Sequence, residues 1–180
     1  MAFLPSLQSG AMLLDVFKAY PDTSKPLIEF HEVLLRGPSP FTEAERELIA
    51  AYVSGLNHCR YCYAVHTATA ERLGVAPGIL ERVIEDIDVA PIPEQMKPVL
   101  SLARKLTHDP GGARQSDADA ILAAGWTETA IYHTVAVTAL FNLMNRLVEG
   151  LGIELDPAYV PVSAERLADR GYLPLIAMLR

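Results

Sequence analysis

The chain has 180 residues, of which 51% are apolar and 21% are charged. This composition is typical of a globular protein, and the length fits one domain spanning residues 1–180. Lys and Arg total 15 against 22 Asp and Glu, so the net charge is −7. An acidic chain without a run of Lys or Arg argues against nucleic acid and against an anionic membrane as partners.

Neither a secretion signal nor a membrane span is evident in the sequence. Residues 1–6 lack the positive region and apolar block of a secretory signal. The most apolar stretch, residues 135–144, is too short to cross a bilayer. We therefore expect a soluble, cytoplasmic protein.

Apolar residues recur at helical spacing along the chain, and no segment alternates as a strand does. Thr42 and Glu45 form a capping box, which marks a helix start, and Gly74 follows another helix as its terminating glycine. Pro21 is expected to end the first helix. The sequence predicts an all-α bundle with helices at residues 10–20, 24–35, 43–57, 59–73, 78–90, 94–108, 116–124, 127–150 and 163–170.

The two cysteines, Cys59 and Cys62, are three residues apart in the fourth expected helix. Side chains at this spacing are neighbours on a helix, within the distance that a disulfide needs. His66 follows Cys62 by four residues, so its imidazole can reach that thiol but not Cys59. We infer that His66 serves Cys62 and that Cys59 is the partner that closes the disulfide. The first turn of a helix is also expected to lower the pKa of a cysteine there.

Glu47 is a candidate for the acid that orients His66. It has no basic neighbour on its own helix, and it begins a row of small residues, Glu47-Ala51-Gly55, that allows another helix to approach closely. Because the cysteine helix follows after a tight turn, we expect its His66 to meet this carboxylate. The inferred proton relay runs from Glu47 to His66 to Cys62.

These residues resemble a known family. Glu47, followed by Cys59, Cys62 and His66, is the pattern of the alkylhydroperoxidase AhpD and carboxymuconolactone decarboxylase superfamily. Residues 46–50 and 141–146 are similar to its peroxidase-related branch, and the redox core is expected at about residues 38–74. AhpD has a histidine between its cysteines where this chain has Tyr61.

The resemblance implies an AhpD-like helical fold that assembles into dimers, trimers or hexamers. It also implies a thiol-dependent peroxidase, an antioxidant oxidoreductase in which Cys62, Cys59, His66 and Glu47 are the catalytic residues. No metal or cofactor is expected beyond the redox-active cysteine pair, which an external dithiol of unknown identity would reduce. The substrate would be a small hydroperoxide, bound beside Tyr61 and Tyr63.

Other interpretations of the same residues remain open. The protein could be a thiol–disulfide oxidoreductase with little peroxidase activity, or a non-catalytic helical oligomer that senses redox state. A decarboxylase of the same superfamily is disfavoured, because that branch does not use the two cysteines. A zinc site would need a fourth ligand, and Cys59 lies too far along a regular helix from His66.

Two further patterns bear on packing. The longest expected helix carries a long apolar stripe, and Asn142, Asn145, Arg146 and Glu149 lie on its opposite face. Polar residues on both flanks of such a stripe suggest that the stripe is buried against another subunit. His31 is interpreted as a structural histidine.

Overall fold

The computed structural model describes residues 2–8 and 10–179, so Met1, Ser9 and Arg180 of the expected domain lie outside the described residues. Within these ranges the chain is helical and has no strand, which confirms the all-α prediction. No described helix is long and apolar enough to cross a membrane. The helices are α1 (Leu13–Ala19), α2 (Pro21–Arg36), α3 (Glu43–Leu56), α4 (Arg60–Arg72), α5 (Ile79–Glu85), α6 (Met96–His108), α7 (Gln115–Ala123), α8 (Glu128–Gly150), α9 (Tyr159–Arg170) and α10 (Leu173–Ala177), with a 3-10 turn at Pro110–Gly112.

The first helix ends before Pro21, as expected, but Pro21 also begins α2, three residues before the expected start at 24, because a proline lacks the N–H that the first turn of a helix leaves unpaired. The largest boundary error is at α5, which ends at Glu85 and not at 90. The capping box at Thr42 is present: the Glu45 N–H donates to the Thr42 hydroxyl at 3.2 Å. The short helix α10 was missed altogether, and α9 begins four residues before the expected position of 163.

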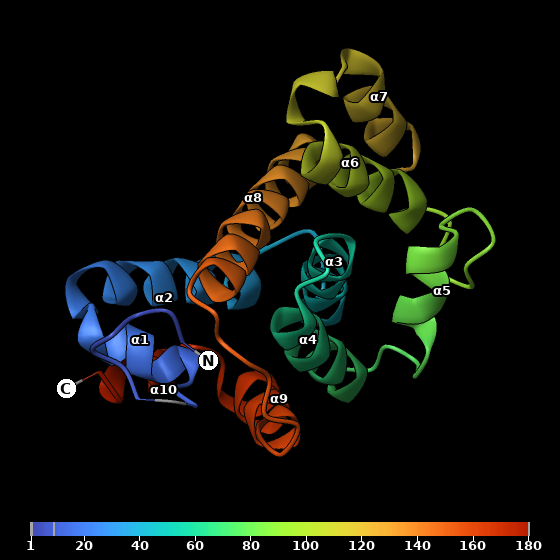
Figure 1. Cartoon of the computed structure of the whole chain (residues 1–180). Helices are drawn as coiled ribbons and strands as arrows, with labels where there is room; N and C mark the ends of the chain where they lie inside the picture. The colour runs from blue at the N-terminus through green and yellow to red at the C-terminus, as the bar shows by residue number, and fades with distance from the viewer. Residues whose placement is uncertain (1, 9, 180) are drawn as a thin grey trace.

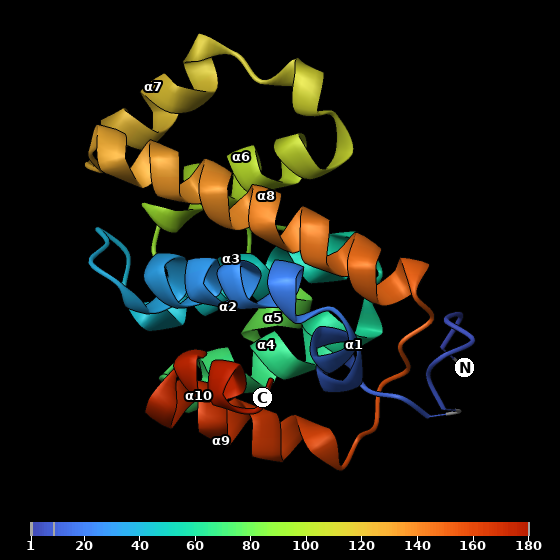
Figure 2. The same cartoon turned by 90° about the vertical axis from the view of Figure 1, so that its left-hand side faces the viewer.

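Helices α3 and α4 lie at the centre of the molecule (Figure 1). Helix α4 packs on α3 and α9, whereas α8 packs on α3 and α6 and crosses the molecule as its longest helix (Figure 2). Buried apolar side chains from these helices form one cluster, in which Tyr52, Phe41 and Phe141 are the largest fully buried members. The cysteine helix is thus enclosed between the core and the C-terminal helices.

The C-terminal segment returns to α2 through an unusual backbone turn. Gly171 has φ +66° and ψ −152°, a conformation that glycine adopts far more easily than other residues. A Cβ at this position would collide with the Glu32 carboxylate, which accepts a hydrogen bond from the Tyr172 N–H at 2.7 Å. Gly171 therefore allows the chain to place Tyr172 against α2.

Substitution of Gly171 by alanine should destabilise the protein by about 1–3 kcal/mol, because the new side chain is strained and displaces Glu32. Urea unfolding measures this change. Gly150→Ala is the matched control, since a Cβ there meets nothing and the residue is helical. Equal free energies of unfolding for the two variants would contradict this account of the turn.

Candidate active site

A tight turn sets the position of the two cysteines. The Cys59 N–H donates to the Ser54 carbonyl at 3.0 Å and the His58 N–H donates to the Gly55 carbonyl at 3.0 Å. This is the Schellman pattern of helix termination, and His58, with φ +56°, occupies the left-handed position that glycine usually takes. The chain reverses within three residues, so that Cys59 caps the N-terminus of α4 and Cys62 lies in its first turn.

Both thiols are deeply buried. Cys59 is 0% exposed and Cys62 is 3% exposed. Cys62 lines an internal cavity of about 60 Å³, and His66, one helical turn further along α4, lines the same cavity. Cys62 and His66 are therefore available to a common small ligand.

Glu47 and His66 are joined by a short hydrogen bond. The distance from His66 Nδ1 to Glu47 Oε2 is 2.6 Å, and Glu47 is 0% exposed. A carboxylate accepts, so Nδ1 carries the proton and Nε2 is left for the cavity side. The edge of the imidazole also packs against Phe141, with ring centroids 4.5 Å apart. The carboxylate and the aromatic ring together fix the orientation of His66.

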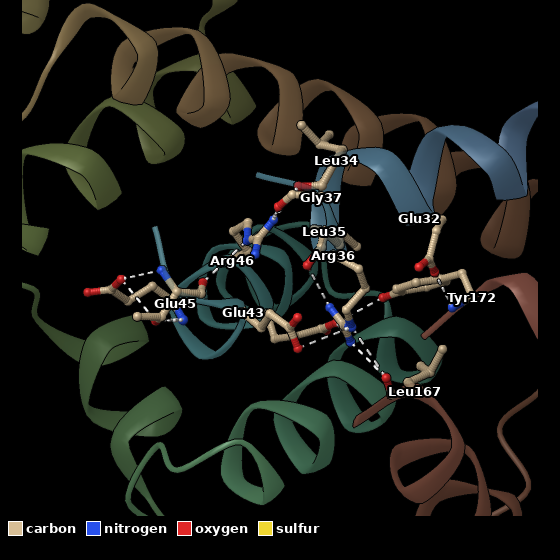
Figure 3. A network of polar contacts seen from close by, with 12 residues as sticks. Glu32, Leu34, Leu35, Arg36, Gly37, Glu43, Glu45, Arg46, Leu167 and Tyr172 are labelled. Atoms are coloured by element: carbon tan, nitrogen blue, oxygen red, sulfur yellow. Dashed lines mark hydrogen bonds and ion pairs between the residues drawn. The ribbon is translucent and has the colours of Figure 1, made fainter. Parts of the chain in front are cut away.

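The second oxygen of Glu47 has two donors that the sequence analysis missed. Arg36 Nη2 donates to Glu47 Oε1 at 2.6 Å, and the Tyr172 hydroxyl donates to the same oxygen at 2.9 Å. Figure 3 shows Arg36 between the Tyr172 ring, 5.1 Å from its centroid, and the Leu167 carbonyl, to which it also donates. Helical spacing could predict neither partner, because Arg36 is 11 positions and Tyr172 is 125 positions from Glu47 in the sequence.

These contacts keep Glu47 ionised. Burial alone would raise the pKa of Glu47, but the charge and hydrogen bond of His66, followed by those of Arg36, lower it to about 2. Burial and the neighbouring Glu47 raise the pKa of Tyr172 well above its usual value. Tyr172 therefore remains a hydrogen-bond donor, and Glu47 remains an acceptor for the His66 N–H.

The expected lowering of the Cys62 pKa by the helix terminus is wrong. The hydrogen bond with Cys59 and the burial of the thiol raise the pKa of Cys62 well above its usual value. Asn145 opposes this effect through a hydrogen bond with the Cys62 side chain. A group that removes the proton is consequently more important here than the helix dipole.

Asn145 is buried inside the chain instead of lying on an outer face of α8. It is 2% exposed, donates to the Ser54 hydroxyl at 3.0 Å, and accepts from Asn57 Nδ2 at 2.9 Å. The Asn145 side chain therefore connects α8 to the turn that precedes Cys59. The expected burial of the apolar stripe of α8 against another subunit stays a prediction.

The two candidate substrate-binding tyrosines lie on different sides of α4. Tyr61 lines the cavity of Cys62, and its ring stacks on Tyr159 with centroids 6.2 Å apart. Tyr63 lies outside this cavity and lines a separate surface cleft that also includes Cys59 and Glu81. Side chains two residues apart on a helix point to nearly opposite sides, so Tyr61 and Tyr63 cannot both line the Cys62 cavity.

His31, interpreted as structural, lines the cavity together with Cys62 and His66. Its Nδ1 lies 2.7 Å from the Leu27 carbonyl, which can only accept, so Nδ1 carries the proton. Burial lowers the pKa of His31 to about 4 despite this hydrogen bond. The remaining cavity lining is mostly apolar and includes Leu13, Leu14, Phe17, Ile28, Val65, Met144 and Leu175.

The fold and the sequence both match known proteins. Residues 21–94 match the model of the carboxymuconolactone decarboxylase family. The chain is 25% identical, with a TM-score of 0.76, to an uncharacterized peroxidase-related protein from Silicibacter sp. TM1040, and the match covers 82% of this chain and 77% of that one. It is also similar to the alkylhydroperoxidase AhpD core of an uncharacterized peroxidase-related protein from Ralstonia eutropha JMP134, with 24% identity and a TM-score of 0.76. That match covers 83% of this chain and 78% of the other. No curated protein matches the chain.

The architecture is therefore that of an AhpD-like helical protein. The motifs that resemble the AhpD-like, carboxymuconolactone decarboxylase superfamily thus lie in a chain that is similar to that family's model over residues 21–94 and to AhpD-like structures over most of its length.

Two buried side chains should give the stability of the protein a characteristic dependence on pH. The depressed pKa of His31 removes stability as the pH falls from 6.5 to about 4, because the unfolded state binds a proton first. The depressed pKa of Glu47 removes about 3 kcal/mol more as the pH falls from 4.5 to about 2. Glu47→Gln should lower stability at neutral pH, and its difference from wild type should shrink through this lower window.

Denaturant unfolding between pH 7 and pH 2 measures both effects. Glu29→Gln, an exposed position on α2, is the matched control and should follow the wild-type curve. A difference between wild type and Glu47→Gln that stays constant from pH 6 to pH 2 would contradict the assignment of Glu47 as a buried carboxylate.

Proposed function

We propose that this protein is a thiol-dependent peroxidase that reduces organic hydroperoxides with Cys62 and Cys59 and is regenerated by an external dithiol. One observation carries the proposal: a buried carboxylate, Glu47, holds His66 by a 2.6 Å hydrogen bond, and His66 shares a cavity with the Cys62 thiol one turn away. The AhpD-like and peroxidase-related relatives support the same class of reaction.

The first step is removal of the Cys62 proton. Because Nδ1–H of His66 donates to Glu47, the free Nε2 acts as the base that accepts the proton from the thiol. Glu47 then stabilises the imidazolium, while Arg36 and Tyr172 hold its other oxygen. This arrangement supplies the thiolate that burial of Cys62 otherwise disfavours.

The second step breaks the peroxide bond. The Cys62 thiolate attacks the terminal oxygen of ROOH, the S–O bond forms, and the O–O bond breaks. The leaving alkoxide takes the proton from the His66 imidazolium and departs as the alcohol ROH. Cys62 is thereby oxidised to a sulfenic acid, and the peroxide is reduced.

The third step closes the disulfide. The Cys59 thiol, in hydrogen-bond contact with Cys62, attacks the sulfenic sulfur and releases water. An external dithiol then restores both thiols by disulfide exchange, so one ROOH and one dithiol give ROH, water and an oxidised dithiol. Because both sulfurs are nearly inaccessible, exchange requires the first turn of α4 to open toward the reductant.

Self-association, which the resemblance implies, is part of this proposal. Large apolar side chains remain exposed on two neighbouring helices, at Phe30 and Val33 of α2 and at Leu143 of α8. A surface of this kind is suited to contact with a second copy of the chain.

Cysteine variants test the assigned roles with tert-butyl hydroperoxide as substrate. Cys62→Ser should lose turnover, because it removes the atom that attacks the peroxide. Cys59→Ser should also stop turning over, but it should accumulate a sulfenic acid at Cys62 that dimedone traps and mass spectrometry locates. Wild type treated with one equivalent of peroxide is the control and should lose two hydrogens as the disulfide forms. Equal peroxide consumption by wild type and Cys62→Ser would refute the proposal.

A further inference from the structure

Arg166 of α9 is the one side chain with a permanent charge among the described residues that line the Cys62 cavity. The other polar groups that line the cavity are thiol, imidazole and hydroxyl groups, and no carboxylate lines it. The charges nearby are already paired, since Glu47 is engaged by Arg36 and His66. The cavity therefore presents a single uncompensated positive charge.

The guanidinium of Arg166 has only neutral partners. Its Nη2 donates to the Tyr159 hydroxyl at 2.8 Å and to the Ser163 hydroxyl at 3.1 Å. Its Nε is buried and has no hydrogen-bond partner within residues 2–8 and 10–179. The ion pairs found in those ranges do not include Arg166. A partly buried guanidinium without an anion retains unused capacity for a carboxylate.

An aromatic pair links Arg166 to the nucleophile. The guanidinium lies over the Tyr159 ring, 5.6 Å from its centroid, and Tyr159 stacks on Tyr61, which directly precedes Cys62. Arg166, Cys62 and the two rings thus border one cavity. A ligand that engages both groups needs an anionic end and a reacting end separated by a short apolar spacer.

The size of the cavity limits that spacer. A cavity of about 60 Å³ is smaller than the roughly 150 Å³ that accommodates benzene, so only a short chain of one or two carbons fits. The apolar walls formed by Val65, Met144 and Leu167 suit such a chain.

Building on the proposed peroxidase function, we propose that Arg166 binds the carboxylate of a short-chain organic hydroperoxide and directs its O–O bond to Cys62. The substrate class is a small hydroperoxy acid instead of a neutral alkyl hydroperoxide. The chemical step is unchanged: Cys62 takes the terminal oxygen, and the product is the corresponding hydroxy acid.

Binding is tested with a probe that cannot react. The redox-inert glycolate should slow alkylation of Cys62 by iodoacetamide in the reduced protein, whereas the neutral alcohol of the same shape, 2-methyl-1-propanol, should protect at least tenfold less well. Arg166→Gln should weaken protection by the acid about tenfold, the effect of losing a charged hydrogen bond, and Arg166→Lys should restore part of it. Arg170→Gln, an exposed change on the same helix, is the matched control and should behave as wild type.

Substrate selection is tested by single-turnover oxidation of the reduced protein without dithiol. Wild type should oxidise faster with hydroperoxyacetate than with the neutral 2-methylpropyl hydroperoxide, and Arg166→Gln should reduce the ratio of the two rates about tenfold. A ratio that Arg166→Gln and Arg170→Gln change equally would overturn the inference, as would equal protection by the acid and the alcohol. If neither hydroperoxide oxidised Cys62 while Arg166-dependent protection persisted, the proposed peroxidase function would fail and the carboxylate site would stand.

Discussion

The site depends on one buried carboxylate with three donors. Glu47 on α3 accepts from His66 on α4, from Arg36 at the end of α2, and from Tyr172 beyond α9. Removing a carboxylate from water is costly, and only donors this close can offset that cost. Because the donors come from three separate segments, the same contacts that keep Glu47 charged also fix those segments around the cysteine helix.

This arrangement determines how the thiol must work. A cysteine buried beside a second thiol has a raised pKa, so the resting protein protects Cys62 as a thiol. Reactivity then depends on His66, whose orientation Glu47 sets. In the proposed mechanism, burial suppresses unwanted reactions of the thiolate, and the His66 base supplies the thiolate when a peroxide occupies the cavity.

Local features of the site could be predicted from the sequence. The neighbours Cys59, Cys62 and His66 follow from helical spacing, and the contact of Glu47 with His66 follows from a close helix pair joined by a tight turn. The helical class was equally accessible, although the start of α2 was placed three residues late, since the proline that stops one helix can also begin the next.

The remaining features depend on how distant helices pack. The positions of Tyr172 and Arg166 relative to Cys62 are decided by the return of the C-terminal segment, which no local spacing encodes. The raised pKa of Cys62 has the same origin, because the degree of burial is a property of the whole fold. The helix terminus alone indicates the opposite shift.

The most direct test of the central claim is the rate at which one equivalent of tert-butyl hydroperoxide oxidises the reduced protein, compared at neutral pH between wild type and folded Glu47→Gln. If Glu47 holds His66 as the base for Cys62, the variant should react at least tenfold more slowly, because it loses part of the roughly 10²–10⁴-fold that general-base catalysis contributes. Equal rates in two proteins with the same helical content would show that the buried carboxylate has no part in activating the thiol.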